Sequence, residues 1–311
     1  MVVPVFNGAQ FLTDTLRSVA AQTHADLEII VVDDASTDGS AQVALDSGIA
    51  LRLIQQPNSG VSQARNTGLA AATGEFVCFL DQDDHWFDAH LARQVACFRQ
   101  HPDIGAVVCP YQHWYPGLDG YALPEEVLPA DAGTRTDPDF SGWVYHQFLL
   151  DNWALTSATM VRRSVLERYG GFDVERPYSE DWELWLRLSR EVRFAKLDWP
   201  PVLYRQHAVQ GSRKARMADH RCDLLASQVE QHGLQSRDGR AVSARVFKQT
   251  WARYRMEFGY HHLQYGDAGI GVRALLEAWR CQPTRLRCLA FAAAGVAGWR
   301  PAQPRLSDPR V

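Results

Sequence analysis

The chain has 311 residues, of which 46% are hydrophobic, and a formal net charge of −4 at pH 7. This length is sufficient for one large domain or two smaller ones, and the Gly and Pro content is too low for a collagen-like or disordered chain. The charge is uneven: residues 1–212 carry 15 Lys and Arg against 28 Asp and Glu (net −13), whereas residues 213–311 carry 17 against 8 (net +9). Either the basic part meets an anionic surface, such as a membrane or a nucleic acid, or it docks on the acidic part.

Short apolar runs alternate with segments of helical periodicity over the first hundred residues. Strands are predicted at Val2–Phe6, Leu27–Val32, Leu51–Ile54 and Phe76–Leu80, and Phe11, Leu12, Leu16 and Val19 recur between the first two at helical spacing. This alternation predicts an α/β fold with a mostly parallel sheet covered on both faces. Such sheets bind ligands at the carboxyl ends of their strands, so the polar residues there are candidates for a site. The first strand is short for a buried strand, which either a mis-assigned or a truncated start would explain.

The pattern becomes irregular and rich in aromatic residues from about 103 to 205. Strands are predicted at Ile104–Cys109, Thr156–Arg162, Arg193–Leu197 and Val202–Arg205, with a helix at Glu180–Arg190. Beyond 213 the pattern is helical, over about 215–232, 241–265, 267–281 and 284–298. We therefore predict an α/β domain over residues 1–212 and a basic helical extension over residues 213–311.

An acidic motif, Asp81-Gln82-Asp83-Asp84, directly follows the apolar run that ends at Leu80. Three carboxylates at a strand end repel one another unless a cation neutralises them. Mg²⁺ is typically held by one or two carboxylates together with substrate phosphates, so the motif favours a divalent metal site for a phosphorylated ligand. The alternative is a helix cap, since Asp84 and Asp88 both suit a helix N-terminus.

Two further acids, Asp33 and Asp34, end the second predicted strand, and Arg65 lies in the helix that follows the third. Carboxylates at that strand end can accept from a ribose hydroxyl or a base N–H, and Arg65 suits phosphate or carboxylate partners. A turn-and-cap sequence and a surface Arg are the alternatives. The chain has no Walker loop and no GxGxxG after its first strand, which disfavours a dinucleotide dehydrogenase.

Four segments resemble family 2 glycosyltransferases of the GT-A fold. These are PVFN (4–7), VVDDASTDGS (31–40), QPNSGVSQARNTGLAAATGEFVCFLDQDD (56–84) and SEDWELWLRL (179–188). They occur in the family's order and spacing and cover about residues 1–212. The segment 213–311 resembles the helical extensions of many bacterial members more weakly. The resemblance implies a GT-A fold and a nucleotide-diphosphate sugar donor, with a UDP-sugar as the first expectation.

The resemblance also implies roles for individual residues. Asp181 matches the catalytic base, and Asp81 and Asp83 match the DxD element, which holds the ribose and a Mg²⁺ or Mn²⁺ ion. Asp84 is a third candidate metal ligand. The nucleotide-sugar pocket is expected to contain Pro4, Phe6, Asn7, Asp34, Arg65 and Glu180 besides Asp81 and Asp83, and His207 and Arg213 from a segment that closes over the diphosphate.

The chemistry of these residue types agrees with that expectation. Glycosyl transfer with inversion needs a base for the acceptor hydroxyl and an electrophile for the departing diphosphate, and a carboxylate and a divalent cation fill these roles. We therefore expect a metal-dependent, inverting transferase that acts on a saccharide or lipid-linked acceptor in cell-surface polysaccharide or glycolipid synthesis. Without the resemblance, Glu180 and Asp181 would be read as an acidic first turn of a helix.

Two other functions compete with this expectation. Nucleotidyl transfer to a sugar phosphate is disfavoured because Pro4 to Gln10 contains no Lys or Arg. A degenerate GT-A domain that serves as a scaffold would be expected to lose the acidic motif or Asp181, and both are present. Among the tryptophans, Trp182 and Trp185 share a helical face with Leu186 and are predicted core residues, whereas Trp86 and Trp153 are candidates for an acceptor pocket.

The sequence also bears on localisation. The longest apolar stretch, Leu286–Trp299, has 14 residues, fewer than the roughly 20 that a spanning helix needs. The N-terminus lacks the pattern of a signal peptide, and no two cysteines form a CxxC pair. We expect a cytoplasmic protein without a nucleic-acid partner. The Arg-rich segment 267–311 either contacts anionic lipid at the inner face of the cell membrane or docks on the catalytic domain.

Overall fold

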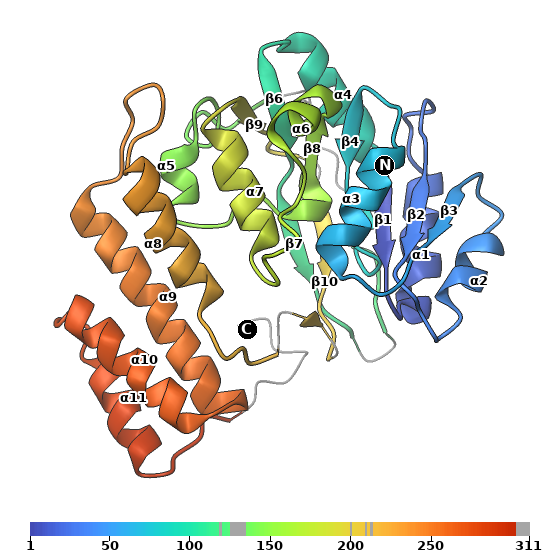
Figure 1. Ribbon diagram of the computed structural model, residues 1–311. Helices are drawn as coiled ribbons and strands as arrows, with labels where there is room; N and C mark the ends of the chain where they lie inside the picture. The colour runs from blue at the N-terminus through green and yellow to red at the C-terminus, as the bar shows by residue number, and fades with distance from the viewer. Residues whose placement is uncertain (118–119, 125–134, 200, 209, 212–213, 303–311) are drawn as a thin grey trace. The chain divides into compact units, whose positions relative to one another are not determined.

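The computed structural model describes residues 1–117, 120–124, 135–199, 201–208, 210–211 and 214–302 (Figure 1). The chain forms two compact units. Unit 1 comprises Met1–Trp114, Ala122–Phe148 and Asn152–Arg205. Unit 2 comprises Tyr115–Tyr121, Leu149–Asp151 and Gln206–Val311. The predicted α/β class with helices at the C-terminal end is confirmed.

A mixed, mostly parallel sheet forms the centre of unit 1. Its strands are β1 (Val2–Val5), β2 (Ile30–Asp33), β3 (Arg52–Gln55), β4 (Phe76–Cys78), β6 (Ile104–Val108), β8 (Thr159–Arg162) and β9 (Arg193–Lys196). β1, β2 and β3 are parallel, β6 is parallel to β9, and β8 is antiparallel to both of its neighbours, β4 and β6. A parallel bridge between Val2 and Phe79 joins β1 to the end of β4. The carboxyl ends of β1, β2 and β4 therefore meet at one edge.

Helices cover both faces of this sheet, as the strand–helix alternation predicts. They are α1 (Ala9–Ala20), α2 (Ser40–Leu45), α3 (Val61–Ala71) and α4 (His90–Gln100). Val3 and Val5 share a buried core with residues of α1 and α4, such as Leu12 and Phe98. Successive strand residues face opposite sides of the sheet, so Val2 faces away from that core. Helix α3 packs closely on Val2, because a Cβ on Gly68 would lie 2.2 Å from a Val2 methyl group.

A second, small sheet lies beside the acidic motif. It contains β5 (His85–Trp86), β10 (Val202–Arg205) and β7 (Tyr111–Trp114), with β10 in the middle. β10 is antiparallel to β5 and parallel to β7. β5 starts one residue after Asp84, so this sheet fixes where the acidic motif ends.

The remaining short elements of unit 1 are the helices α5 (Tyr145–Phe148), α6 (Arg163–Tyr169) and α7 (Glu180–Ser189) and a 3-10 turn at Thr156–Ala158. On α7, Trp182 and Trp185 are buried, as predicted. The prediction that Trp86 lines an acceptor pocket is wrong. Its side chain is fully buried, stacks on His90 and donates from Nε1 to the Ser157 carbonyl, because it belongs to a strand that alternating hydrophobicity did not indicate. Trp153 is also buried, stacked on Phe148.

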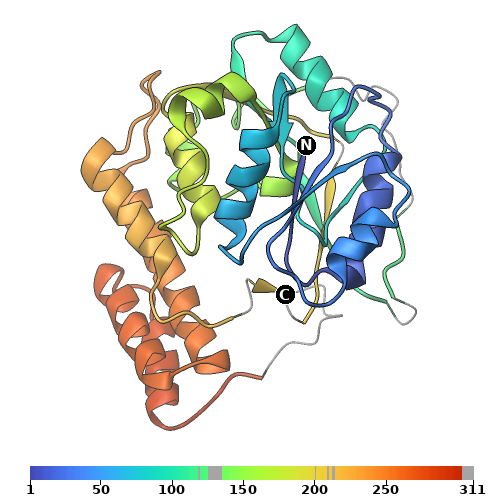
Figure 2. The same ribbon diagram turned by 45° about the vertical axis from the view of Figure 1, so that its right-hand side comes forward.

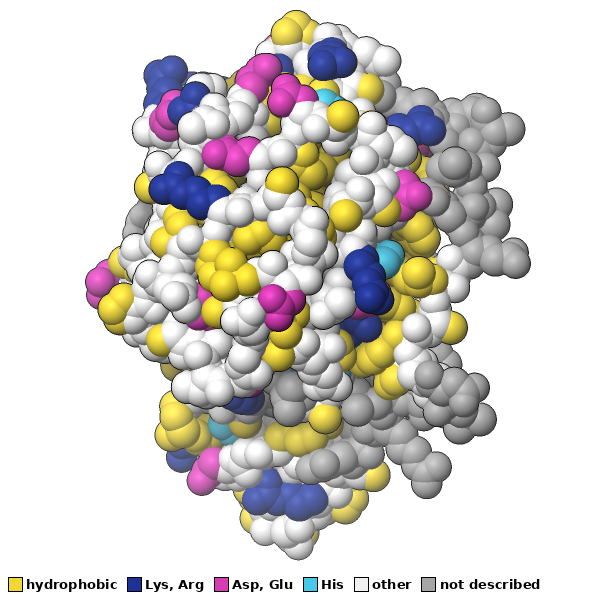
Figure 3. Space-filling model, turned by 90° about the vertical axis from the view of Figure 1, so that its right-hand side faces the viewer, with side chains coloured by type: hydrophobic (Ala, Val, Ile, Leu, Met, Phe, Trp, Pro, Cys, Tyr) yellow, Lys and Arg dark blue, Asp and Glu magenta, His cyan; other side chains and the backbone are white. Residues whose placement is uncertain are grey.

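The charges of unit 1 are dispersed over at least one of its faces. On the side that carries α2 and β3, acidic and basic side chains are intermixed (Figure 3). The net charge of −13 over residues 1–212 is therefore not gathered into one acidic patch there.

Unit 2 is helical, as predicted. Its helices are α8 (His220–His232), α9 (Ala244–Tyr265), α10 (Ala268–Cys281) and α11 (Arg287–Val296), which form the orange-to-red part of the chain (Figure 2). α9 and α10 cross at two glycines: a Cβ on Gly259 would lie 2.8 Å from the Gly271 carbonyl oxygen, and the reverse distance is the same. Side chains cap three of these helices, since Asp219, Ser243 and Asp267 accept from backbone N–H groups in the first turns of α8, α9 and α10.

The end of unit 2 exposes apolar side chains. Leu286, Val296 and Trp299, in and beside α11, are 68%, 76% and 44% exposed. Arg300, one of the arginines of the basic segment, donates to the carbonyl oxygens of His262, Leu263 and Gly266 and so caps the end of α9. Among the described residues, no helix has the length and apolar character needed to span a bilayer.

Candidate active site

A buried arginine connects two acidic segments of unit 1 at the predicted edge of the sheet. Arg65 in α3 contacts Asp81 at 2.7 Å through Nη2 and Glu180 at 2.9 Å through Nη1. Its side chain is 4% exposed, and its guanidinium lies over the Phe172 ring, 5.0 Å from the centroid. Burial opposes the charge, but Asp81 and Glu180 overcompensate and raise the pKa of Arg65. The surface-Arg alternative is thereby wrong, and Arg65, Asp81 and Glu180 are brought together as the sequence implied.

Asp181 lies beside this cluster, at the start of α7. Its Oδ2 accepts from Asn152 Nδ2 at 3.1 Å, and its Oδ1 accepts from the Trp182 N–H at 2.6 Å. Burial and the neighbouring Glu180 raise the pKa of Asp181 to about 7, against the opposing effect of Arg65. A general base is most effective when its pKa lies near the working pH, and a carboxylate with this pKa meets that condition near neutrality.

The other two acids of the motif have different surroundings. Asp83 is half-buried, and its backbone carbonyl accepts from Arg205 Nε at 2.6 Å. The Asp84 side chain is fully buried and accepts from Ser157 Oγ at 2.6 Å and from the Arg205 N–H at 3.2 Å. Burial, together with Asp83 and Asp81, raises the pKa of Asp84 well above its ordinary value. Asp84 thus faces the interior, whereas Asp81 and Asp83 are partly accessible.

The turn after β1 is clamped to the acidic motif by Gln82. Its Oε1 accepts from the Phe6 N–H at 2.8 Å, and its Nε2 donates to the Phe6 carbonyl at 3.1 Å. Pro4 is buried in β1, while the Phe6 ring is 48% exposed. Asn7 accepts from the Thr37 N–H at 2.8 Å and so connects this turn to the loop after β2. An exposed aromatic ring on a turn fixed from two sides suits a flat ligand group such as a nucleotide base.

Asp34 supports the neighbouring loop. Its carboxylate is buried and accepts from the N–H groups of Ser59 and Gly60, at 2.8 and 2.9 Å, and from Gln56 Nε2 at 2.7 Å. A carboxylate has about four lone-pair positions, so roughly one remains for a ligand. The predicted contact with the base or ribose stays a prediction.

Three non-glycine residues with positive φ border these segments. They are Asn7 (50°), Ala35 (62°) and Ser179 (58°), which lie after β1, after β2 and directly before α7. Such conformations cost free energy and persist where the surroundings impose them, often at functional sites. All three flank candidate site residues.

Two predicted pocket residues are not assigned by the geometry of unit 1. His207 belongs to unit 2. Arg213 lies outside the described residues. The roles that the resemblance implies for both stay predictions.

The carboxylates of the acidic motif are of the ligand type that a hard divalent cation prefers. No group of three or more His, Cys, Asp or Glu side chains within the described ranges is close enough together to hold a metal ion. Burial and the nearby charges of Asp83 and Glu180 nevertheless raise the pKa of Asp81, even with Arg65 in contact. One guanidinium does not balance this set of carboxylates, so Mg²⁺ or Mn²⁺ would relieve the remaining repulsion.

Sequence reasoning missed three residues that hold the site together. Gln82 clamps Phe6, Asn152 donates to Asp181, and Ser157 donates to Asp84 and accepts from the Asp81 N–H at 3.1 Å. Gln82 lies inside the acidic motif, so its position was a usable signal. Asn152 and Ser157 lie in the irregular region, where nothing in the local pattern distinguishes them.

The sequence of the chain is similar to those of known glycosyltransferases. The sequence profile described as "Glycosyl transferase family 2" matches residues 1–170, more than half of the chain. The chain belongs to this family. An uncharacterized glycosyltransferase of Nostoc sp. is 32% identical over 189 residues, which are 60% of this chain and 55% of the relative. The putative teichuronic acid biosynthesis glycosyltransferase TuaG of Bacillus subtilis is 37% identical over 100 residues, 30% of this chain and 39% of TuaG. The chain thus spans about half the length or less of these curated relatives.

Solved structures establish the GT-A fold of this family 2 member. Residues 1–349 of TarS from S. aureus, in complex with UDP-GlcNAc, superpose with a TM-score of 0.60 at 19% identity, over 95% of this chain and 86% of that one. The mannosyltransferase PcManGT from Pyrobaculum calidifontis, in complex with GDP-Man and Mn²⁺, gives a TM-score of 0.56 at 23% identity, over 95% and 78% of the two chains.

Proposed function

We propose that this family 2 glycosyltransferase transfers a sugar, with inversion, from a nucleotide-diphosphate sugar to an acceptor hydroxyl. The observation that carries the proposal is the half-buried Asp181, whose pKa of about 7 suits a general base, beside the Arg65–Asp81–Glu180 cluster. In the proposed step, the acceptor oxygen attacks C1 of the donor sugar from the face opposite the diphosphate. Asp181 takes the acceptor proton, the C1–O bond to the diphosphate breaks, and the nucleoside diphosphate leaves.

Asp81 and Asp83 are the proposed ligands of a Mg²⁺ or Mn²⁺ ion. Such an ion, when bound, neutralises charge on the departing diphosphate. We leave Asp84 out of the proposed ligand set, because its side chain is fully buried and hydrogen-bonded to Ser157 and Arg205. Asp84 instead holds the end of the motif in place.

The donor is proposed to lie between the turn after β1 and the start of α3. Phe6 and Asn7 would contact the base, Asp34 the base or ribose, and Arg65 and Glu180 the diphosphate-sugar side. TarS, which shares the fold, is described with UDP-GlcNAc, and PcManGT with GDP-Man and Mn²⁺. A UDP-sugar is our first candidate.

The cellular role is proposed to be cell-surface polysaccharide or glycolipid synthesis. The name of TuaG, to which the chain is similar, points to a cell-wall polymer. We assign catalysis to a domain over residues 1–212 and propose that the basic segment 267–311 of the extension touches anionic lipid, where a lipid-linked acceptor would lie. The exposed Leu286 and Val296 support contact with a lipid surface, which we propose to be the inner face of the cell membrane.

A thermal-shift panel tests the proposal. UDP, GDP, UDP-GlcNAc and GDP-Man are each added with and without Mn²⁺, and hydrolysis of the two sugar nucleotides is followed in parallel. We expect one nucleotide class to raise the melting temperature in a metal-dependent way, and Asp81→Asn and Asp83→Asn to remove that dependence. A panel without any metal-dependent shift would contradict the proposed donor site.

A further inference from the structure

The segment 148–152 is hydrogen-bonded at both of its ends to α7, the helix that begins with Glu180 and Asp181. Before the segment, the Phe148 carbonyl accepts from Trp182 Nε1 at 2.8 Å. At its other end, Asn152 Nδ2 donates to Asp181 Oδ2 at 3.1 Å. All four residues lie in unit 1. The three residues between these contacts, Leu149–Asp151, belong to unit 2.

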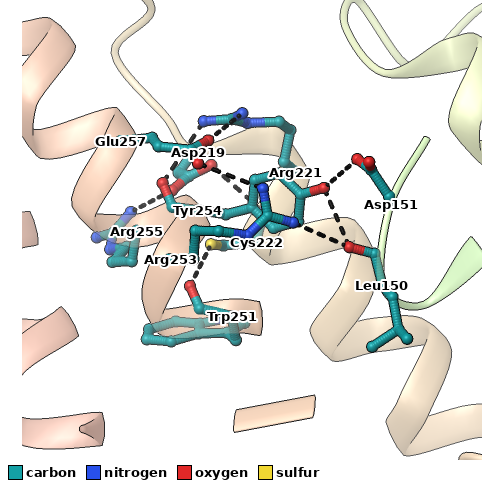
Figure 4. A network of polar contacts seen from close by, with 10 residues as sticks. All are labelled: Leu150, Asp151, Asp219, Arg221, Cys222, Trp251, Arg253, Tyr254, Arg255 and Glu257. Atoms are coloured by element: carbon teal, nitrogen blue, oxygen red, sulfur yellow. Dashed lines mark hydrogen bonds and ion pairs between the residues drawn. The ribbon is translucent and has the colours of Figure 1, made fainter. Parts of the chain in front are cut away.

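Helix α9 of unit 2 holds these intervening residues (Figure 4). The Tyr254 hydroxyl is shared between Asp151 Oδ1 at 2.7 Å and the Leu150 carbonyl at 3.2 Å. Arg253 Nη2 donates to the same carbonyl at 3.1 Å. Both acceptors can only accept, so the Tyr254 hydroxyl must act as the donor.

Tyr254 is itself firmly placed. The residue is 4% exposed, and the guanidinium groups of Arg221 and Arg253 lie 4.8 and 4.2 Å from its ring centroid. Arg221 and Arg253 both pair with Glu257, and Arg255 pairs with Asp219, the capping residue of α8. Burial and the Asp151 carboxylate raise the pKa of Tyr254, so its hydroxyl keeps its proton. The network thus presents a rigid donor to Leu150 and Asp151.

We propose that Tyr254 is a positioning residue for the transfer reaction: by fixing Leu150 and Asp151, it holds the Asn152 amide against the Asp181 carboxylate. Asp151 and Asn152 are consecutive, so a fixed Asp151 restricts where the Asn152 side chain can reach. The inference rests on the proposed role of Asp181. It gives the helical extension a part in catalysis that is separate from membrane contact.

The contact with Asn152 determines how the base is oriented. One carboxylate oxygen of Asp181 is held by Asn152 and the other by the Trp182 N–H, which together fix the plane of the carboxyl group. Loss of the Asn152 contact frees one oxygen and allows that plane to rotate away from the acceptor proton. Donor contacts at Arg65 and Asp81 lie on other elements, so catalysis would suffer while donor binding is kept.

The test compares Tyr254→Phe with Tyr260→Phe in the full chain. Tyr260 also lies in α9, and its hydroxyl makes no hydrogen bond to any residue that the structure describes. Tyr260→Phe therefore removes the same kind of hydroxyl group without removing a contact to the segment 148–152. Backbone hydrogen exchange is measured over residues 149–153. Turnover is measured with UDP-GlcNAc and Mn²⁺, or with the sugar nucleotide that the panel above selects, for both variants and for each combined with Asn152→Ala.

We expect Tyr254→Phe to speed exchange in 149–153 and to lower kcat about tenfold with an unchanged KM for the donor, whereas Tyr260→Phe does neither. In the Asn152→Ala background, Tyr254→Phe should have no further effect on kcat, because its influence passes through Asn152. Three results would overturn the inference. These are unchanged hydrogen exchange over 149–153 in Tyr254→Phe, a loss of kcat on Tyr254→Phe that is just as large in the Asn152→Ala background, and an equal effect of Tyr260→Phe. A wrong assignment of Asp181 as the base would give a different result, namely turnover that is retained in Asp181→Asn.

Discussion

Asp181 is the residue whose protonation state the proposed chemistry depends on. Burial and Glu180 raise its pKa to about 7, and a base acts only when it is deprotonated. The value of kcat/KM is therefore expected to rise with pH through about 7 and then to level off. The measurement is a pH–rate profile with saturating metal. The exposed Asp88→Asn variant is the control and should keep the same midpoint. A profile that is flat between about pH 6 and pH 8 would show that Asp181 is not the base.

Arg65 is the residue whose loss should be felt in stability as well as in binding. It is the contact partner of both Asp81 and Glu180, and its removal leaves two partly buried carboxylates without that partner. Arg65→Met is expected to lower the free energy of unfolding by about 3 kcal/mol, measured by urea denaturation.

Arg17, exposed on α1, provides the matched control for this substitution. Arg17→Met should change the free energy of unfolding by less than about 0.5 kcal/mol. If Arg65→Met and Arg17→Met change the free energy of unfolding equally, the contacts of Arg65 with Asp81 and Glu180 make no specific contribution to stability.

At the scale of elements, the end of β1 and the end of β4 act together through Gln82. Gln82→Leu removes both hydrogen bonds to the Phe6 backbone and frees the turn that carries the exposed ring. We expect the Kd for UDP to rise about tenfold, while the free energy of unfolding changes by less than about 1 kcal/mol. Titration calorimetry with UDP measures the first quantity.

The control for the turn is Gln63→Leu, which removes only a contact to Thr67 within α3, 3.3 Å in length. Its Kd for UDP should equal that of the unsubstituted protein. If Gln82→Leu leaves the Kd unchanged as well, Phe6 does not contact the nucleotide.

The elements that the sequence predicted are those defined by local periodicity. The runs Ile29–Val32 and Phe76–Leu80 are apolar over their whole length, and the acids that follow them stand at strand ends as expected. The antiparallel direction of β8 was not predictable, because alternation of side chains is the same in either direction. The strand at Trp86 has two residues, too few to show a period. Asn152 reaches Asp181 across 29 positions of sequence, a pairing that only the folded topology creates.

At the scale of the whole molecule, the basic extension is expected to bring the enzyme to anionic lipid. The protein should float with vesicles that contain phosphatidylserine and not with phosphatidylcholine alone. Arg287→Gln, beside the exposed Leu286, should weaken binding about fivefold, as expected for loss of one charge near the surface.

A matched control is available in unit 2, where Arg240 pairs with Asp238 at 2.8 Å in a loop before α9. Arg240→Gln should leave flotation unchanged. Binding that ignores both lipid charge and Arg287 would contradict membrane contact through this segment.

The proposed mechanism requires Asp181 of this family 2 glycosyltransferase to take the proton of the acceptor. The most direct measurement pairs Asp181→Asn with the unsubstituted enzyme, in a thermal shift with UDP and Mn²⁺ and in a turnover assay on the same preparation. Asn keeps the size of Asp and cannot accept a proton at neutral pH. We expect an unchanged nucleotide-induced shift of the melting temperature and a loss of turnover of about a hundredfold or more. Turnover close to that of the unsubstituted enzyme would contradict it.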